Sequence, residues 1–391
     1  MITVGVFFGG RSVEHEVSVI TAMQTMAAFP GDRVTAVPVY IAKTGAWYSG
    51  DELRTLDAFR DVARLVERAT RVRLRGDPTV GGATIEAEPR RGFMGGGTRD
   101  IAHIDVAMPL VHGSNGEDGT LQGLFELIDV AYCGSGVAAS AVSMDKRLAK
   151  AAFRAAGLAV VDDIVLARER WRDDGDTVIT EVERGFAYPL FVKPMSLGSS
   201  IGVSRVEDAT QLRAAIELAL TYDTRCLVEP AQEDIVEINC AVLGRGDDLR
   251  VSACEQPKAS GLLTYEDKYL SKGAKAPDAG GKVGSQRIVP APLSGTMTHL
   301  VQAAAKSAFS AIGAEGVARV DFLVRPDREE IIVNEINTVP GSLSFYLWEP
   351  AGLSFPELVG TLVDLALTRH EVKSRTVSSI DTWLLTGTPR S

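Results

Sequence analysis

The segment from Gly316 to Asn337 constrains the fold of this chain more than any other part of the sequence. Two apolar runs flank a polar turn around Pro326 and Arg328, and this pattern predicts a β-hairpin. Successive side chains of a strand point to opposite faces. With a turn centred on Arg328, we expect four polar side chains on one face, as the opposed pairs Asp321 with Glu335 and Arg319 with Asn337.

These side chains offer one cation, two carboxylates and one amide oxygen on an otherwise apolar sheet. The oxygen ligands Asp321, Glu335 and Asn337 suit a hard divalent ion, such as Mg²⁺ bridging phosphates. Arg319 beside them is suited to stabilising developing negative charge. The alternative is an amphipathic hairpin with a solvated polar face, and the hairpin alone does not decide between the two.

Length, charge and cysteine content limit the classes of protein to which this chain can belong. A length of 391 residues predicts two or three domains, and a charged fraction of 24% is ordinary for a soluble globular protein. The net charge of −10 disfavours non-specific binding to nucleic acid or to an anionic membrane. We find neither an apolar run long enough to span a bilayer nor a secretory leader. Four scattered cysteines without a CxxC pair predict a reducing cytoplasm, without a disulfide or zinc framework.

The expected elements alternate as in α/β proteins. Residues 4–8, 17–29 and 34–40 predict strand, helix and strand, and two glycines end the first strand, where open α/β sheets bind ligands. Residues 72–100 are rich in glycine and charge and are expected to be irregular. Residues 259–290 predict a lid or an unordered segment. Further helices are expected at residues 119–128, 146–156, 211–220 and 296–312, and from a capping box at Ser354 to about residue 367.

Two lysines are candidate phosphate ligands. Lys193 ends a strand before a Gly/Ser loop at residues 195–202, which can place an ammonium and backbone N–H groups around phosphates. The loop is not a Walker A motif, and a plain turn with a surface lysine is the alternative. Lys146 falls in the first turn of an expected helix, where the macrodipole disfavours a cation unless an anionic ligand is present. A solvated lysine is equally compatible with that position.

Several other polar residues are weaker candidates. Glu229 and Glu237 follow a short strand, where a carboxylate can bind a ribose, although spacing alone favours two solvated acids. Glu14, in the segment after the first strand, could bind a substrate ammonium or merely favour a helix start. His112 opens another turn-forming segment and lacks a partner at zinc-ligand spacing. Backbone amides around Gly341 are suited to capturing a carboxylate.

Taken together and in order, these segments resemble the D-alanine–D-alanine ligases of the ATP-grasp superfamily over roughly residues 1–370. The carrying motifs are Gly-Gly-Arg-Ser-Val-Glu-His-Glu-Val-Ser at 9–18, His-Gly-Ser-Asn-Gly-Glu-Asp-Gly-Thr-Leu-Gln-Gly at 112–123, Gly-Ser-Gly at 134–136, Ser-Met-Asp-Lys at 143–146, Lys-Pro at 193–194, Gly-Ser-Ser-Ile-Gly at 198–202, Tyr-Glu-Asp-Lys-Tyr at 265–269, Arg-Val-Asp at 319–321 and Asn-Glu-Ile-Asn at 334–337. Each motif alone is weak, but their shared order is specific.

The resemblance implies a three-domain α/β ATP-grasp fold, with an N-terminal open parallel sheet and ATP clasped between two α+β domains. The implied units are an N-terminal substrate-binding domain, a central ATP-grasp domain, a C-terminal ATP-grasp domain with a mobile loop at about 259–290, and a tail, at residues 1–132, 133–230, 231–375 and 376–391. It further implies a cytoplasmic homodimer that uses amino-acid substrates and binds neither nucleic acid nor membrane.

The resemblance also assigns roles to individual residues. The implied ATP ligands are Lys146, Lys193, Ser199, Ser200, Glu229, Glu237, Lys268 and Asn334. The implied ligands of two Mg²⁺ or Mn²⁺ ions are Asp321, Glu335 and Asn337. The implied substrate contacts are Glu14, His112, Arg319, Gly341 and Tyr346. A hydrogen-bonded trio that orients the first amino acid is matched by Glu14, Ser199 and Tyr269, and Arg319 matches the residue that stabilises the acyl phosphate.

The implied reaction is ATP-dependent ligation of two D-alanines to D-alanyl-D-alanine, a peptidoglycan precursor, through an acyl phosphate. One alternative is an ATP-grasp amide ligase that joins an amino acid to a different acceptor, in resistance or secondary metabolism. Another is a non-catalytic nucleotide-binding protein, against which the lysines, Arg319 and the acidic ligands argue.

The chain departs from the family pattern after Pro340 and Gly341. Tyr346 stands where the family carries a serine, and Phe345 stands where a histidine is common. A tyrosine hydroxyl still donates a hydrogen bond, but a changed pocket contact alters discrimination by roughly 1–3 kcal/mol. The second substrate therefore stays open, although Tyr269 resembles the tyrosine of dipeptide-forming members and argues against a D-lactate acceptor.

Overall fold

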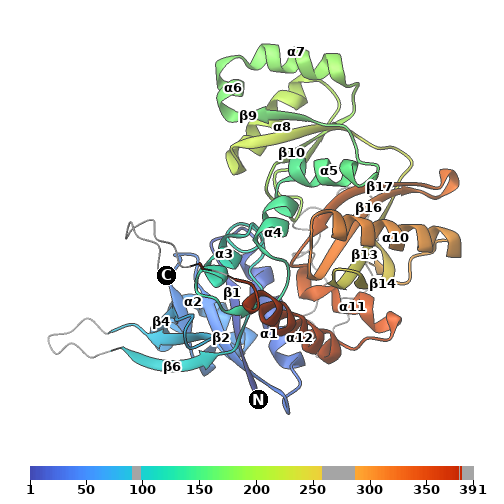
Figure 1. The fold of residues 1–391 in the computed structure, drawn as a ribbon. Helices are drawn as coiled ribbons and strands as arrows, with labels where there is room; N and C mark the ends of the chain where they lie inside the picture. The colour runs from blue at the N-terminus through green and yellow to red at the C-terminus, as the bar shows by residue number, and fades with distance from the viewer. Residues whose placement is uncertain (90–97, 258–286, 378, 381–391) are drawn as a thin grey trace, which may run out of the picture.

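The computed structural model describes residues 1–89, 98–257, 287–377 and 379–380 (Figure 1). Its strands form three separate sheets of eight, four and five strands, each built from a different part of the chain. The mixed α/β architecture agrees with the fold class expected from the sequence. Among the described residues no single helix is long and apolar enough to cross a membrane, and only one helix pair, bent by 114°, passes that test by length and composition.

The N-terminal sheet has the strand order β6-β5-β4-β3-β2-β1-β7-β8. Its strands are β1 (Ile2–Gly9), β2 (Val34–Ile41), β3 (Trp47–Ser49), β4 (Thr70–Gly76), β5 (Ala83–Ala87), β6 (Arg99–Ile104), β7 (Val106–Pro109) and β8 (Ala131–Tyr132). Its helical segments are α1 (His15–Ala28), η1 (Asp51–Arg54), η2 (Leu56–Asp61), α2 (Val62–Arg68) and α3 (Thr120–Leu127). Only β2-β1-β7-β8 is parallel, so the expected open parallel sheet forms half of a mixed sheet.

The expectation of irregular structure at residues 72–100 is wrong for much of the part that the structure describes, because β4, β5 and β6 form antiparallel strands there, whereas residues 90–97 lie outside the described residues. Val72 and Ile85 are buried on one face of this extension. Arg73 and Arg75 extend from β4 to contact the buried carboxylate of Glu86 on β5. The charges that suggested a loop are therefore paired across two strands, while the apolar side chains between them reach the core.

The central sheet is antiparallel, with the order β11-β10-β12-β9. Its elements are β9 (Ile164–Ala167), α6 (Arg168–Asp173), α7 (Gly175–Gly185), β10 (Leu190–Pro194), β11 (Ser204–Val206), α8 (Ala209–Tyr222) and β12 (Arg225–Pro230). Leu190 and Val192 of β10 pack with Leu212 and Ile216 of α8 in one apolar cluster. Because side chains alternate along a strand, Lys193 points to the opposite face, away from this core.

The C-terminal sheet has the order β15-β14-β13-β16-β17. Its strands are β13 (Val236–Arg245), β14 (Asp248–Pro257), β15 (Arg287–Ile288), β16 (Gly316–Arg325) and β17 (Glu330–Asn337). The helices that contribute to its core are α10 (Gly295–Ala311), α4 (Val137–Met144) and α5 (Lys146–Ala155). Ala149 and Phe153 of α5 belong to this core, although α5 lies within the range expected for the central unit. The division at residues 132/133 and 230/231 therefore stays a proposal.

The hairpin predicted from the sequence is confirmed, together with its register. Residues 326–328 form the short turn η3 (Pro326–Arg328). Asp321 lies opposite Glu335, and Arg319 lies opposite Asn337. Val320, Phe322 and Val324 are buried in the same cluster as residues of α10. The polar residues therefore lie on the sheet face opposite α10.

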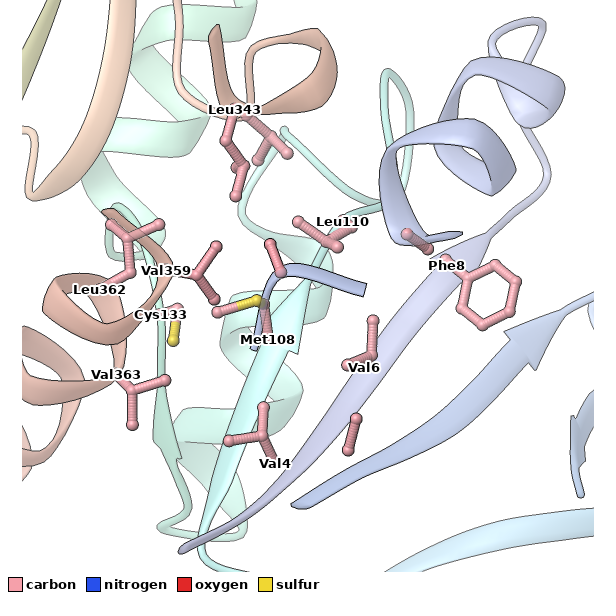
Figure 2. Close-up of a cluster of buried hydrophobic side chains, with 14 of the residues drawn as sticks. Val4, Val6, Phe8, Met108, Leu110, Cys133, Leu343, Val359, Leu362 and Val363 are labelled. Atoms are coloured by element: carbon pink, nitrogen blue, oxygen red, sulfur yellow. The ribbon is translucent and has the colours of Figure 1, made fainter. Parts of the chain in front are cut away.

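The chain ends by packing back on the N-terminal sheet. Residues 341–374 form η4 (Gly341–Ser344), α11 (Phe345–Trp348), η5 (Glu349–Ala351) and α12 (Phe355–Ser374). The capping box at Ser354 is confirmed, although α12 continues beyond residue 367 to Ser374. Figure 2 shows Val359, Leu362 and Val363 of α12 facing Val4 and Met108 of the sheet, all within one buried cluster. Burial of each such side chain stabilises the fold by about 1.5–3 kcal/mol, so α12 fastens the C-terminal part of the chain to the N-terminal sheet.

Candidate active site

The candidate active site lies where segments associated with all three sheets converge. It is bounded by the polar face of the β16–β17 hairpin, the loop after β10, and the loops after β1 and β7. Ser199 in the loop after β10 donates a hydrogen bond to Glu14, which follows β1. Lys193 of β10 donates one to Asn334 Oδ1 of β17 over 3.3 Å. Residues that are far apart in the sequence therefore meet in one place.

Arg319 and Asp321 form a bidentate ion pair on the polar face of the hairpin. Arg319 Nε lies 2.6 Å from Asp321 Oδ1, and a terminal guanidinium nitrogen lies 2.6 Å from Oδ2. Burial alone would lower the pKa of Arg319, but the Asp321 carboxylate raises it well above its usual range. Asn337 donates a hydrogen bond to the same carboxylate over 3.3 Å. The arginine is therefore charged and held in a fixed orientation.

A row of polar side chains crosses the C-terminal sheet through Asp321. Strand register pairs its members in the order Glu255, Asn239, Asp321 and Glu335. The predicted metal ligands Asp321 and Glu335 lie at one end of the row, and the third, Asn337, lies two residues beyond Glu335 on β17, opposite Arg319. Within the described ranges no cluster of three or more His, Cys, Asp or Glu is arranged to hold a metal. Two carboxylates and an amide oxygen nevertheless fit a hard cation that completes its shell with phosphate oxygens.

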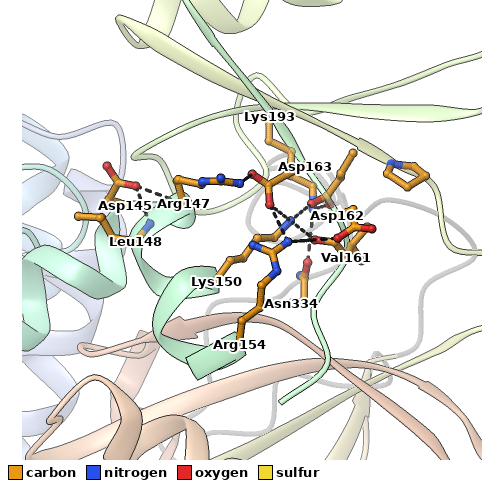
Figure 3. A network of polar contacts seen from close by, with 12 residues as sticks. Asp145, Arg147, Leu148, Lys150, Arg154, Val161, Asp162, Asp163, Lys193 and Asn334 are labelled. Carbon is orange, nitrogen blue, oxygen red and sulfur yellow. Dashed lines mark hydrogen bonds and ion pairs between the residues drawn. The ribbon is translucent and has the colours of Figure 1, made fainter. Parts of the chain in front are cut away.

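Glu229 at the end of β12 lies between two lysines, so the expectation of a solvated acid is wrong. Its side chain is 3% exposed, with Oε2 lying 2.5 Å from Lys150 Nζ and Oε1 in contact with Lys193 Nζ. Burial alone would raise the pKa of Glu229, but the two lysines lower it below its usual value. Figure 3 shows Lys150, Lys193 and Asn334 within this network. The carboxylate therefore fixes the ammonium group of Lys193.

Lys150 was missed by the sequence reasoning, although α5 carried a signal for it. The residue lies on the buried side of the helix with Ala149 and Phe153, where a lysine needs a partner. Its ammonium also donates to the carbonyl of Val161 over 3.1 Å. A lysine inside the apolar face of an expected helix thus indicates a buried carboxylate elsewhere in the chain.

Lys146, the first residue of α5, points into the site rather than into solvent. Its ammonium donates a hydrogen bond to the carbonyl of Leu197 over 2.6 Å, in the Gly/Ser loop. Burial lowers the pKa of Lys146, which the nearby carboxylate of Glu335 partly offsets. The helix start itself is capped by Asp145, whose side chain accepts hydrogen bonds from two backbone N–H groups. Lys146 therefore lies close to both the loop and the hairpin.

The Gly/Ser loop has a left-handed backbone at two consecutive serines. Ser199 and Ser200 have φ values of +51° and +58°. Residues other than glycine rarely adopt such positive φ values. Such strain is typical of ligand-binding loops. Ser199 reaches the buried carboxylate of Glu14, so two members of the predicted trio meet. Its third member, Tyr269, and the predicted phosphate ligand Lys268 lie outside the described residues.

His112 is buried and neutral beneath the segment that follows the hairpin. His112 Nε2 lies 3.0 Å from Thr21 Oγ1, and the same hydroxyl accepts the N–H of Ser342 over 3.0 Å. Burial lowers the pKa of His112 to about 4, so the imidazole is uncharged at neutral pH. His112 therefore supports the segment beginning at Gly341, which starts η4, through one intervening side chain.

Glu117, which is half-buried, is a second residue that the sequence reasoning did not single out. Its carboxylate accepts the N–H of Gly113 over 2.7 Å and the N–H of Val339 over 3.1 Å. Burial and the nearby Glu14 raise the pKa of Glu117 to about 8. The residue thereby ties the loop after β7 to the segment after β17. The turn-forming motif at 112–119 was its only sequence signal.

Tyr346 of α11 reaches the other end of the polar row. Its hydroxyl donates a hydrogen bond to Glu255 Oε2 over 3.1 Å, and the guanidinium of Arg287 lies 4.1 Å from its ring centre. Burial raises the pKa of Tyr346 to about 12, so the phenol keeps its proton. Glu237, the predicted ribose ligand, is exposed on β13. Its position on the same strand as Asn239 leaves it on the polar face of the sheet.

Comparison with known proteins decides the family. The family model of the D-ala D-ala ligase N-terminus matches residues 3–135, and that of the D-ala D-ala ligase C-terminus matches residues 152–364. The chain belongs to the D-alanine–D-alanine ligase family. Its relatives include the D-alanine–D-alanine ligase of Chloroherpeton thalassium, 38% identical over 94% of this chain and 96% of the relative. The D-alanine–D-alanine ligase of Thermosipho melanesiensis is 33% identical over 98% of both chains.

Solved structures of this ligase family share the fold. The D-alanine–D-alanine ligase from Coxiella burnetii superposes with a TM-score of 0.76 at 30% identity, over 96% of both chains. The VanG D-Ala:D-Ser ligase from Enterococcus faecalis superposes with a TM-score of 0.75 at 30% identity, over 93% of this chain and 99% of that one. The family expected from the sequence motifs and its ATP-grasp fold are thus confirmed.

Proposed function

We propose that this chain joins two D-alanine molecules to D-alanyl-D-alanine, coupled to the conversion of ATP to ADP and phosphate, supplying peptidoglycan synthesis. The observation that carries the proposal is the charged Arg319, held by Asp321 beside Glu335 and within one site with Glu14 and Lys193. Membership of the D-alanine–D-alanine ligase family supports the same activity. We further propose a homodimer, which rests on the family resemblance alone, and a cytoplasmic location, which the scattered cysteines support.

ATP would lie between the central and C-terminal sheets. Lys146 and Lys193 supply two ammonium groups at this boundary, and backbone N–H groups of the Gly/Ser loop add further donors for phosphate oxygens. Glu237 on the polar face is our proposed ribose ligand. Glu229 would act on ATP through Lys193, because both of its oxygens already contact lysines.

The metal ligands would be Asp321, Glu335 and Asn337, and we propose two Mg²⁺ ions. When bound, the ions would neutralise phosphate charge and orient the transferred group. Asp321 also holds Arg319, so that carboxylate would serve both the cation and the arginine. In the hairpin register, Asp321 lies opposite Glu335, and Arg319 lies opposite Asn337 on the facing strand.

The first step would activate the first amino acid. Glu14 would hold its ammonium, with Ser199 fixing the orientation of Glu14. A carboxylate oxygen of the amino acid attacks the γ-phosphorus of ATP, the bond to the β,γ-bridging oxygen breaks, and an acyl phosphate and ADP form. Arg319 would stabilise the negative charge that accumulates on the transferred group. Fixing both reactants in this orientation lowers the entropic part of the barrier.

The second step would form the peptide bond. The neutral amine of the second amino acid attacks the acyl carbon, and the tetrahedral intermediate carries its negative charge on the former carbonyl oxygen. Arg319 is our proposed partner for this oxyanion. The carbon–oxygen bond to phosphate then breaks, and the nitrogen passes its proton to the departing inorganic phosphate. Exclusion of water matters because acyl phosphates hydrolyse.

One specific observation favours an acceptor other than D-alanine. Tyr346 stands in place of the serine expected from the family. The VanG relative named above is a D-Ala:D-Ser ligase, so an acceptor other than D-alanine occurs on this fold. Incubation with ATP, Mg²⁺, isotopically labelled D-alanine and a panel of D-serine, D-lactate and other D-amino acids tests both candidates. D-alanyl-D-alanine as the main product supports the first proposal. That proposal is overturned if product forms only when another acceptor is present and contains D-alanine joined to that acceptor.

A further inference from the structure

At the edge of the C-terminal sheet, Tyr346, Glu255 and Arg287 form a cluster that the function proposed above has not used. The three side chains come from α11, β14 and β15, respectively. Glu255 is buried at 2% exposure, yet it lies in the same polar row as Asp321. Strand register places Glu255 two strands away from Asp321, the carboxylate that holds Arg319, so the cluster lies on the same sheet face as the proposed oxyanion partner.

The hydroxyl of Tyr346 is committed to the protein. It donates to Glu255 Oε2 over 3.1 Å, and a phenol has only one proton to donate. Tyr346 therefore does not replace the expected serine as a hydrogen-bond donor to a substrate. The cluster must contact a second amino acid through another group.

Arg287 has the chemistry and the orientation for that contact. Its Nε lies 3.4 Å from Glu255 Oε1, and its guanidinium stacks 4.1 Å from the centre of the Tyr346 ring. One edge and one face of the planar group are therefore occupied. The terminal nitrogens contact no acceptor among the described residues, and the side chain is 42% exposed. Such a fixed edge matches a carboxylate, which arginine binds through two parallel hydrogen bonds.

We propose that Arg287 binds the carboxylate of the second amino acid, with Tyr346 and Glu255 as positioning residues. This assignment rests on the proposed ligase function and moves carboxylate recognition from the expected serine position to β15. The acceptor class is thus an amine that carries a carboxylate.

The test compares acceptors with and without a carboxylate. In the wild-type chain, ATP and D-alanine with hydroxylamine would yield D-alanyl hydroxamate, which reports acyl-phosphate formation without the second site. For Arg287→Met we expect the KM for D-alanine as acceptor to rise about 10- to 100-fold, as for lost charged hydrogen bonds. The KM for D-alaninamide as acceptor and the rate of hydroxamate formation should change less than 3-fold.

Further variants separate this role from a structural one. Arg287→Lys keeps the charge and should recover part of the affinity for D-alanine, whereas Tyr346→Phe should give an intermediate loss. Arg250→Met, at an exposed arginine of β14, is the matched control and should leave both acceptors unchanged. Equal losses for D-alanine and D-alaninamide in Arg287→Met would overturn the proposal. Absence of hydroxamate in the wild-type chain would instead contradict the ligase function on which it rests.

Discussion

Lys150 Nζ lies 2.5 Å from Glu229 Oε2, and both side chains are almost completely buried. The other oxygen of Glu229 contacts Lys193, the proposed phosphate ligand. The two ammonium groups lower the pKa of the buried Glu229 carboxylate, and the carboxylate in turn holds both lysines in place. We therefore expect Lys150 to influence the proposed nucleotide site indirectly, through Glu229 and Lys193.

Substitution of Lys150 with methionine should weaken both the fold and the nucleotide site. Removing one partner of a buried ion pair costs about 3–5 kcal/mol of unfolding free energy, and we expect the lower end because Lys193 still faces Glu229. The KM for ATP should rise because Lys193 loses its fixed orientation. Urea unfolding and ADP formation measure the two effects. Arg170→Met, which breaks the exposed pair with Glu181, is the control and should cost less than about 1 kcal/mol. Unchanged stability and unchanged KM for Lys150→Met would refute the positioning role.

Arg319→Ala should lower kcat far more than it lowers nucleotide affinity. The guanidinium is charged and oriented by Asp321, so its loss removes a preorganised donor from the reacting group. Loss of one such donor costs about 10²- to 10³-fold in kcat. Steady-state ADP formation and calorimetric ATP binding measure the two quantities. Arg325→Met, at the far end of the same strand, should keep kcat close to that of the wild type. A variant that loses ATP binding as severely as turnover would show that Arg319 acts on nucleotide binding.

Stability should decrease as the pH falls from about 6.5 to about 4, because of His112. The folded-state pKa of His112 lies below its usual value, so the unfolded chain binds a proton in this range while the folded chain does not. The contribution amounts to roughly 3 kcal/mol at neutral pH and is lost progressively on acidification. Urea unfolding of the wild type and of His112→Gln across this range measures it. Parallel pH profiles for the two proteins would show that His112 does not titrate as described.

Removal of divalent metal should stop turnover and leave the fold intact. The oxygen donors of the hairpin belong to strands that are already paired, so the register does not depend on a cation. EDTA should abolish ADP formation with little change in the thermal midpoint. Asp321→Asn should raise the Mg²⁺ concentration needed for half-maximal activity, whereas Asp327→Asn in the turn should not. Equal Mg²⁺ dependence of Asp321→Asn and the wild type would remove Asp321 from the metal site.

The hairpin and its register follow from local rules, which explains why the sequence sufficed there. Alternation along two short strands and a Pro-containing turn determine which side chains face each other, and Asp321 and Glu335 do so. Strands β4 and β5 were missed because the glycines and charges of residues 72–100, among them Arg73 and Arg75 of β4, predicted an irregular segment. Those charges are neutralised by Glu86 on a neighbouring strand, which is a contact that no single segment reveals.

Long-range partners of buried polar groups could not be derived from the sequence. Glu229 looked solvated by its spacing, yet its partner Lys150 lies 79 residues away. Glu117 meets the backbone of Val339 across 222 residues. These contacts depend on how three sheets are placed relative to each other, and that placement depends on packing such as that of α12 on the N-terminal sheet. The family motifs identified the residues around the site, whereas their hydrogen-bond partners required the structure.

The most direct test of the account is the stoichiometry of ADP and dipeptide formed from ATP, Mg²⁺ and D-alanine alone by the purified chain. We predict one D-alanyl-D-alanine, identified by mass spectrometry, for each ADP released. ADP without dipeptide, or no reaction until a different acceptor is added, would contradict the claim that D-alanine is both substrates.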